Sequence, residues 1–97
     1  MKEIDIFKKV GGSFAENKDI ARDIRLGELL PALNIGEEVV INFEGIESAT
    51  QSFIHALISD VIRKKGVGVL DKIYFQHCNP TVKKIINIVI EYMQDTN

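Results

Sequence analysis

The fold is decided by residues 39–65, VVINFEGIESATQSFIHALISDVIRKK, which predict one buried strand, one tight connection and one amphipathic helix. The strand, residues 39–43, is rich in β-branched residues and has few polar positions, so we expect its sheet to be covered on both faces. Glu44 and Gly45 then end it. Hydroxyl and amide side chains gather where the connection meets the helix, so this junction is where chemistry is expected.

The helix of this stretch has an apolar face and a polar face. A spacing of i, i+4 and i+8 places six apolar side chains on one broad stripe: Phe53, Ile54, Leu57, Ile58, Val61 and Ile62. The opposite side carries Ser52, His55, Ser59 and Arg63. We therefore expect the apolar stripe to pack on the sheet and the polar side chains to meet solvent.

The start of this helix can be placed in two ways. Ser48-Ala49-Thr50-Gln51 matches a capping box, but Thr50 is an equally good N-cap with Gln51 as the first helical residue. Either start leaves Ser52 in the first turn, where free N–H groups and the helix dipole would stabilise a phosphoryl group by about 0.3–1 kcal/mol. In the simpler interpretation these side chains only cap the helix.

The composition is that of one globular domain over residues 1–97, since 45% of the residues are apolar and two are proline. The net charge of −2 comes from scattered charges, so neither nucleic acid nor a membrane is an expected partner. Apolar runs are too short to span a membrane and the N-terminus is too charged for a signal peptide, which predicts a cytoplasmic protein. The single cysteine, Cys78, is expected to be a small core residue.

The chain is expected to begin with a β-hairpin. Ile4 and Ile6 alternate with polar residues, and Gly11-Gly12 can adopt the positive φ angles of a two-residue turn. We predict a strand over residues 2–10 that returns through residues 13–15. A capping box at residues 13–16, which would start a helix there, is the alternative.

A helix is predicted next, from Asn17 or Lys18 onward. Pro31 clashes with the carbonyl of residue 27 and removes a hydrogen bond, so this helix should be kinked or end near Leu30. Residues 34–36, Asn-Ile-Gly, are a stop signal before the central strand.

The last third of the chain predicts a strand over residues 70–77 and a final helix. Asn79-Pro80 is a strong helix start, an N-cap followed by proline at the first helical position. The helix carries a regular apolar stripe: Val82, Ile85, Ile86, Val89, Ile90 and Met93. Ile88 and Tyr92 lie off this stripe. Together with Phe53 or Phe14 they could form an apolar patch for a partner or a second copy, and a wide core face explains them equally well.

The predicted element order is strand with hairpin, helix, strand, helix, strand, helix. Strands separated by helices imply right-handed crossovers and parallel pairing. We therefore predict an α/β fold in which helices pack on one small mixed sheet.

The polar residues predict no catalytic or metal site. His55 and His77 each lack a second His, Cys or carboxylate at a ligand spacing. Ser52 and His55 lie three residues apart on one helix without a third group to orient the histidine. We expect a protein that is not an enzyme and that needs no cofactor.

Two stretches resemble the STAS domain of bacterial anti-sigma factor antagonists, and more closely the STAS-like family of unknown function that is often encoded with histidine-kinase-type ATPases. VVINFEGIESATQSFIHALI is similar to the strand, loop and helix of that fold, where the loop of classical antagonists ends in Asp-Ser-Ser-Gly. CNPTVKKII is similar to the helix start Ser-Pro-x-Val-Lys-x-Leu. The resemblance implies a single STAS-like domain.

In classical antagonists a serine kinase of the ATPase fold phosphorylates a serine at the start of the second helix and thereby weakens the complex. The matching position here is Ser52, with Thr50, Gln51 and Phe53 in place of the aspartate, the first serine and the glycine. The resemblance implies a signalling module that docks onto a histidine-kinase-type ATPase or a serine kinase, with possible phosphorylation of Ser52. The implied docking residues are Glu47, Ser48, Thr50, Gln51, Ser52, His55 and Ser59.

Two other functions remain open at this point. The first is a sensor that binds a small molecule or lipid in a cleft near the Asn42 end of the sheet, because ligands favour the carboxyl ends of strands in α/β folds. The second is a plain assembly domain that forms a homodimer through Ile88 and Tyr92.

Overall fold

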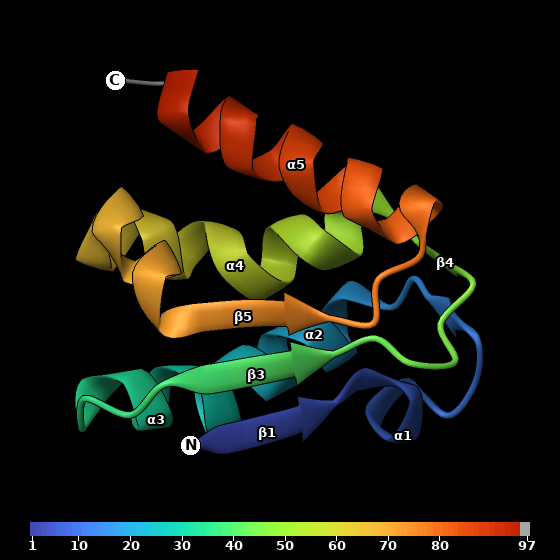
Figure 1. Ribbon diagram of the computed structural model, residues 1–97, viewed down its shortest axis with the longest axis horizontal. Helices are drawn as coiled ribbons and strands as arrows, with labels where there is room; N and C mark the ends of the chain where they lie inside the picture. Colours follow the sequence, from blue (N-terminus) through green and yellow to red (C-terminus); the bar gives the residue numbers. More distant parts are fainter. Residues whose placement is uncertain (96–97) are drawn as a thin grey trace.

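Three parallel strands form the main sheet (Figure 1). The computed structural model describes residues 1–95. The strands lie in the order β1 (Lys2–Asp5), β3 (Val39–Asn42), β5 (Ile73–Gln76). Val39 and Ile41 of the central strand are fully buried on one face of the sheet. On the other face Val40 is buried, but its neighbours Glu3 and Tyr74 are exposed, so the expected cover on both faces is wrong. The α/β class with helices on a small sheet is confirmed, but the described strands pair in parallel throughout and the sheet is not mixed.

The predicted N-terminal hairpin is wrong. The chain leaves β1 at Asp5, whose carboxylate accepts a backbone hydrogen bond (3.2 Å) and starts the short helix α1 (Ile6–Val10). Gly11 ends α1 at a φ of +76°. β2 (Phe14–Ala15) then pairs with β4 (Ser48–Ala49) in parallel and not with β1. An aspartate that satisfies a free N–H of a first helical turn outweighs a two-residue alternation of isoleucines.

The next helix contains a π-helical turn. Its parts are α2 (Lys18–Ile24), η1 (Arg25–Leu29) and α3 (Leu30–Asn34). Leu30 donates its N–H to the carbonyl of Arg25, so the ladder has widened to i→i−5 just before Pro31. The predicted interruption at the proline is therefore a π-turn, after which the helix continues to the predicted stop signal.

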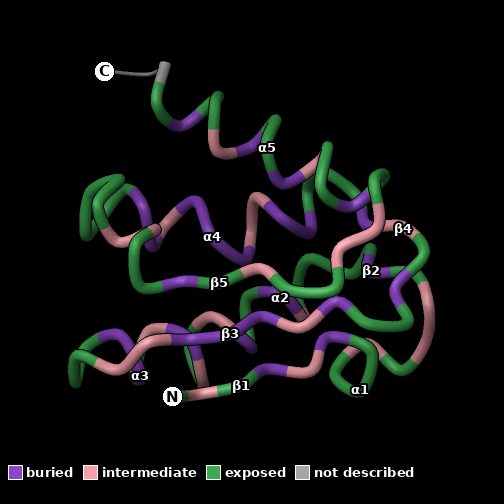
Figure 2. Tube along the Cα trace, in the orientation of Figure 1, coloured by how far each residue is buried: buried purple, intermediate pink, exposed green. Residues whose placement is uncertain are grey.

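The long helix α4 (Gln51–Lys65) lies between two other helices (Figure 1). It packs against α2 and against α5 (Pro80–Asp95). The six apolar residues predicted for its core stripe are all buried (Figure 2). After Gly66 the chain forms the 3-10 helix η2 (Val67–Lys72), which makes β5 shorter than the predicted strand.

The final helix begins where the sequence predicts. Asn79 Oδ1 accepts a hydrogen bond from the Val82 N–H (2.8 Å). On the predicted stripe, four residues are buried and Ile85 and Ile90 are half-buried against the core. The predicted patch changes, because Phe53 is fully buried, whereas Phe14, Ile88 and Tyr92 are exposed.

Candidate functional site

The start of α4 lies beyond the carboxyl ends of the parallel strands (Figure 1). Thr50 is the N-cap, because its Oγ1 accepts a hydrogen bond from the Phe53 N–H (3.1 Å). Ser48, the other candidate, belongs to β4. Ser52 is exposed in the first turn, with its Oγ 3.3 Å from Thr50 Oγ1. The structure thus decides between the two starts and leaves the Ser52 hydroxyl at the surface.

A groove of about 730 Å³ runs beside this first turn. Its lining consists of Lys18 from α2, Tyr92 from α5, and Gln51, Ser52, His55 and Ala56 from α4. Three of the predicted docking residues, Gln51, Ser52 and His55, are thereby brought to one surface. Lys18 places a positive charge on the same surface, and Tyr92 adds an aromatic ring that is 57% exposed.

Glu47 and Ser48 lie outside the lining of this groove. Their backbone N–H groups point to the Ser13 carbonyl, at 2.8 Å from Glu47 N and 3.4 Å from Ser48 N. The Glu47 carbonyl accepts a hydrogen bond from Asn79 Nδ2 (2.8 Å). The connection before α4 is therefore tied to β2 and to the start of α5, and it fixes the position from which α4 begins.

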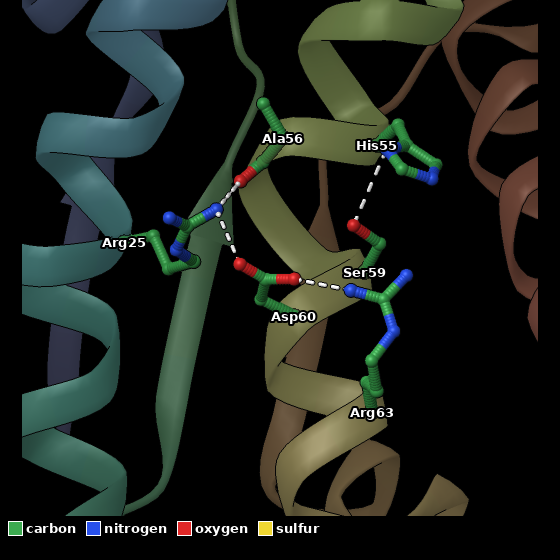
Figure 3. Close-up of polar contacts among 6 residues, drawn as sticks. All are labelled: Arg25, His55, Ala56, Ser59, Asp60 and Arg63. Carbon is green, nitrogen blue, oxygen red and sulfur yellow. Dashed lines mark hydrogen bonds and ion pairs between the residues drawn. The ribbon is translucent and has the colours of Figure 1, made fainter.

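The expected exposure of Ser59 is wrong. Its side chain is only 3% exposed, and its Oγ lies 3.3 Å from Nδ1 of the half-buried His55 (Figure 3). Because α4 is covered by helices as well as by the sheet, part of its polar side is also buried. Ser59 therefore cannot contact a partner directly, and its hydroxyl instead lies against the imidazole of His55, which lines the groove.

One turn further on, an ion-pair network ties η1 to α4 (Figure 3). Arg25 Nη1 donates to the Ala56 carbonyl (2.6 Å) and lies 3.5 Å from Asp60 Oδ2. The second carboxylate oxygen of Asp60 binds Arg63 (2.5 Å). Asp60 is thus a structural bridge between two helices, and Ala56, which it helps to hold through Arg25, lines the groove.

Ser52 and His55 have different neighbours, since Ser52 Oγ lies beside Thr50 Oγ1 and His55 Nδ1 lies beside Ser59 Oγ. Among residues 1–95, no three His, Cys, Asp or Glu side chains come together in a way that could hold a metal ion. Burial raises the pKa of the Cys78 thiol, and the nearby charge of Lys83 opposes this only in part. The structure therefore keeps this cysteine in its less reactive thiol form.

At the end of the sheet where a ligand cleft was expected, the Asn42 side chain makes local hydrogen bonds. Asn42 Nδ2 donates to Glu3 Oε2 (3.1 Å), and Asn42 Oδ1 accepts from the Glu44 N–H (2.9 Å). The amide closes the turn after β3. The groove at the start of α4 lies at the same end of the sheet but uses other residues.

Sequence reasoning did not place Lys18, Tyr92 or Arg25 at this groove, although it named Tyr92 for an apolar patch with Ile88. Each comes from a helix far along the chain from residues 39–65, so only the packing of α2 and α5 on α4 reveals them. The one available signal was the exposed position of Tyr92 off the apolar stripe of α5.

The fold and this site are those of a small α/β domain with a polar groove at a helix start. A family model for the STAS-like domain of unknown function matches residues 22–83, so the chain belongs to the STAS-like family. The match runs from α2 through β3, α4 and β5 to the first turn of α5. Neither a curated protein nor a solved structure matches the chain significantly. Within residues 1–95, no helix has the length and apolar character needed to cross a membrane.

Proposed function

We propose that this chain is a non-enzymatic regulatory module that docks onto a protein partner, an ATPase or a serine kinase, and that phosphorylation of Ser52 controls the docking. The observation that supports this proposal is the exposed Ser52 hydroxyl in the first turn of α4, on the wall of a groove. A hydroxyl in this place can be reached by a kinase, and its modification changes the surface that a partner contacts.

The charges around the groove favour such control. A phosphoryl group on Ser52 would add nearly two negative charges, close to the free N–H groups of the first turn and on the same surface as Lys18. Its cost to the fold is therefore small. The same group would turn a groove with one cationic side chain into an anionic surface, which repels an acidic partner or attracts an arginine.

The docking surface that we propose is narrower than the one predicted from the sequence. Gln51, Ser52 and His55 remain, and Lys18 and Tyr92 join them. Ser59 acts by holding His55, and the Glu47–Ser48 backbone acts by holding the start of α4. Thr50 caps the helix.

The phosphorylation is tested by incubating the chain with ATP in an extract of its source cells, followed by intact mass measurement and peptide mapping. We expect one phosphoryl group on Ser52, absent from Ser52→Ala and present on Thr81→Ala. Thr81 is a matched control because it is exposed in the first turn of α5, as Ser52 is in α4. An unmodified chain in an extract that phosphorylates other proteins would contradict the switch.

The docking is tested separately with a partner isolated by affinity capture and then purified. Ser52→Glu should change its Kd by about tenfold, whereas Thr81→Glu should leave the Kd unchanged. If Ser52→Glu and Thr81→Glu have the same Kd, Ser52 does not control docking. If Tyr92→Ala also leaves the Kd unchanged, the partner does not bind at this groove.

A second candidate function rests on the volume of the same groove. At about 730 Å³, it falls in the range of small-molecule pockets, about 300–1,000 Å³. A sensor of this kind would show a rise in Tm with a metabolite in the absence of any protein partner. His55→Ala should abolish that rise if the ligand occupies this groove.

A further inference from the structure

The two edges of the main sheet differ in charge. The outer strand β1 has the sequence Lys-Glu-Ile-Asp, and charged residues on an edge strand discourage pairing with another chain. The other outer strand, β5, has the sequence Ile-Tyr-Phe-Gln and carries no charge. Its residue types have high β-propensity. The β5 edge therefore lacks the charged side chains that protect β1.

The backbone of Phe75 faces this unprotected edge. The Phe43 N–H donates to the Gln76 carbonyl (2.9 Å), and Gln76 lies opposite Asn42 in the parallel register. Alternate residues of a parallel strand direct their N–H and C=O groups to the same side. Tyr74 and Gln76 thus bond to β3, and the N–H and C=O of Phe75 point away from it.

A groove of about 540 Å³ lies along the same edge, between β5 and α5. Phe75 forms part of it, and Ile86 and Ile90 of α5 provide an apolar wall. Among the described residues that line it, Lys83 is the only one with a charged side chain. The groove thus combines an unpaired strand edge, an apolar wall and a single positive charge.

We propose that the groove between β5 and α5 binds an extended peptide segment of a partner protein, which adds to β5 as a fourth strand. Its backbone would exchange hydrogen bonds with the N–H and C=O of Phe75. An apolar side chain would pack on Ile86 and Ile90, and an acidic residue would pair with Lys83. This site is separate from the groove at Ser52 and does not depend on the function proposed for that groove.

The position of α5 favours a single strand over a second copy of the chain. If β5 of a second copy paired here in the antiparallel sense, the α5 helices of both copies would lie on the same face of the joined sheet. Each α5 forms the wall of its own groove. The two helices would then compete for the space above the new strands, whereas an extended peptide brings no helix with it.

The experiment uses a phage-displayed library of random twelve-residue peptides, selected on the full chain. We expect enriched peptides with alternating apolar residues and an acidic residue. In NMR-detected amide exchange, a synthetic copy should slow the Phe75 amide and leave the Tyr74 amide, which already bonds to β3, unchanged. The shifts of Ile86 and Ile90 should change at the same time.

Two charge reversals on α5 provide the matched pair. Lys83→Glu should weaken the acidic peptides about fivefold, whereas Lys84→Glu should not, because Lys84 lies outside this groove. Both side chains are exposed, so neither change threatens the fold. An unenriched library, or peptides that leave the Phe75 amide unchanged, would overturn the proposal. If exchange of the Phe75 amide slows as the protein concentration rises in the absence of peptide, a second copy of the chain occupies this edge. That result would also overturn the proposal.

Discussion

Replacing Asp60 by Asn should lower the free energy of unfolding by about 2 kcal/mol, because it leaves a largely buried guanidinium without its carboxylate. The side chain of Arg25 is 12% exposed and that of Asp60 is 34% exposed. The described residues offer no acceptor to the buried Nε of Arg25, so its charge depends on Asp60 and the Ala56 carbonyl. Exposed pairs contribute about 0–1 kcal/mol, and breaking a buried pair costs about 3–5 kcal/mol. The Arg25–Asp60 pair is partly buried, so we expect its loss to cost an amount between these two values.

The assay is thermal and urea unfolding followed by circular dichroism. For a domain of this size, a loss of 2 kcal/mol corresponds to a fall in Tm of roughly 10 °C. Arg63→Ala is the matched control, because it removes the other partner of Asp60. The Arg63 side chain is 61% exposed, so its removal should lower the free energy of unfolding by less than about 0.5 kcal/mol. Arg25→Met, which removes the buried charge itself, should cost less than Asp60→Asn. If Asp60→Asn were no worse than Arg63→Ala, the desolvation argument would be refuted.

Three further changes test other parts of the fold by urea unfolding. Gly45→Ala should lower the free energy of unfolding by about 1 kcal/mol more than Gly36→Ala. Both glycines have a positive φ, but only at Gly45 would the new Cβ meet the side chain of Phe7, at 2.8 Å. Equal losses in the two variants would contradict this. Thr50→Ala should cost about 1 kcal/mol through the lost cap, and an unchanged midpoint would show that the cap is dispensable. Burial raises the pKa of Glu28, but the hydrogen bonds and charges of Lys9 and Lys2 outweigh this effect and hold the pKa below its usual 4.5. The stability that this carboxylate contributes is therefore present above pH 4.5 and is lost as the pH falls through the lowered pKa. Glu28→Gln should therefore destabilise the chain at pH 7 and reduce its loss of stability on acidification, and parallel pH profiles of both proteins would argue against this.

The parts of the fold that follow from the sequence are those where many residues agree. The strand and helix of residues 39–65 have apolar residues at nearly every core position, and α5 has both a cap at Asn79 and a regular stripe. At these places local preference and tertiary packing favour the same structure. The element order of the α/β fold follows from them.

The N-terminal segment could not be predicted in the same way, because its structure depends on distant residues. Phe14 and Ala15 form a strand only by pairing with Ser48 and Ala49. A pair of two-residue strands leaves almost no pattern in the sequence. The capping aspartate at Asp5 was a local signal, but the Gly-Gly pair that follows α1 suggested a different turn.

The candidate site was predicted in its centre and not at its margins. Ser52, Gln51 and His55 belong to one helix turn, so their spacing already places them together. Lys18 and Tyr92 reach the groove only through helix packing. Ser59 was expected on an exposed polar face of α4. It is buried because α4 packs against α2 and α5 as well as against the sheet.

The parallel pairing of all described strands also determines how the chain can fold over time. Lys2 pairs with Val39, and Val39 pairs with Ile73, so each neighbouring pair in the main sheet closes a loop of more than thirty residues. No hairpin can form early and template the rest. On the ribosome, the first strand must remain unpaired until the central strand has emerged, and the sheet is complete only after β5 follows. Refolding should accordingly be slower than that of a helical bundle of equal length, with the helices forming before the sheet.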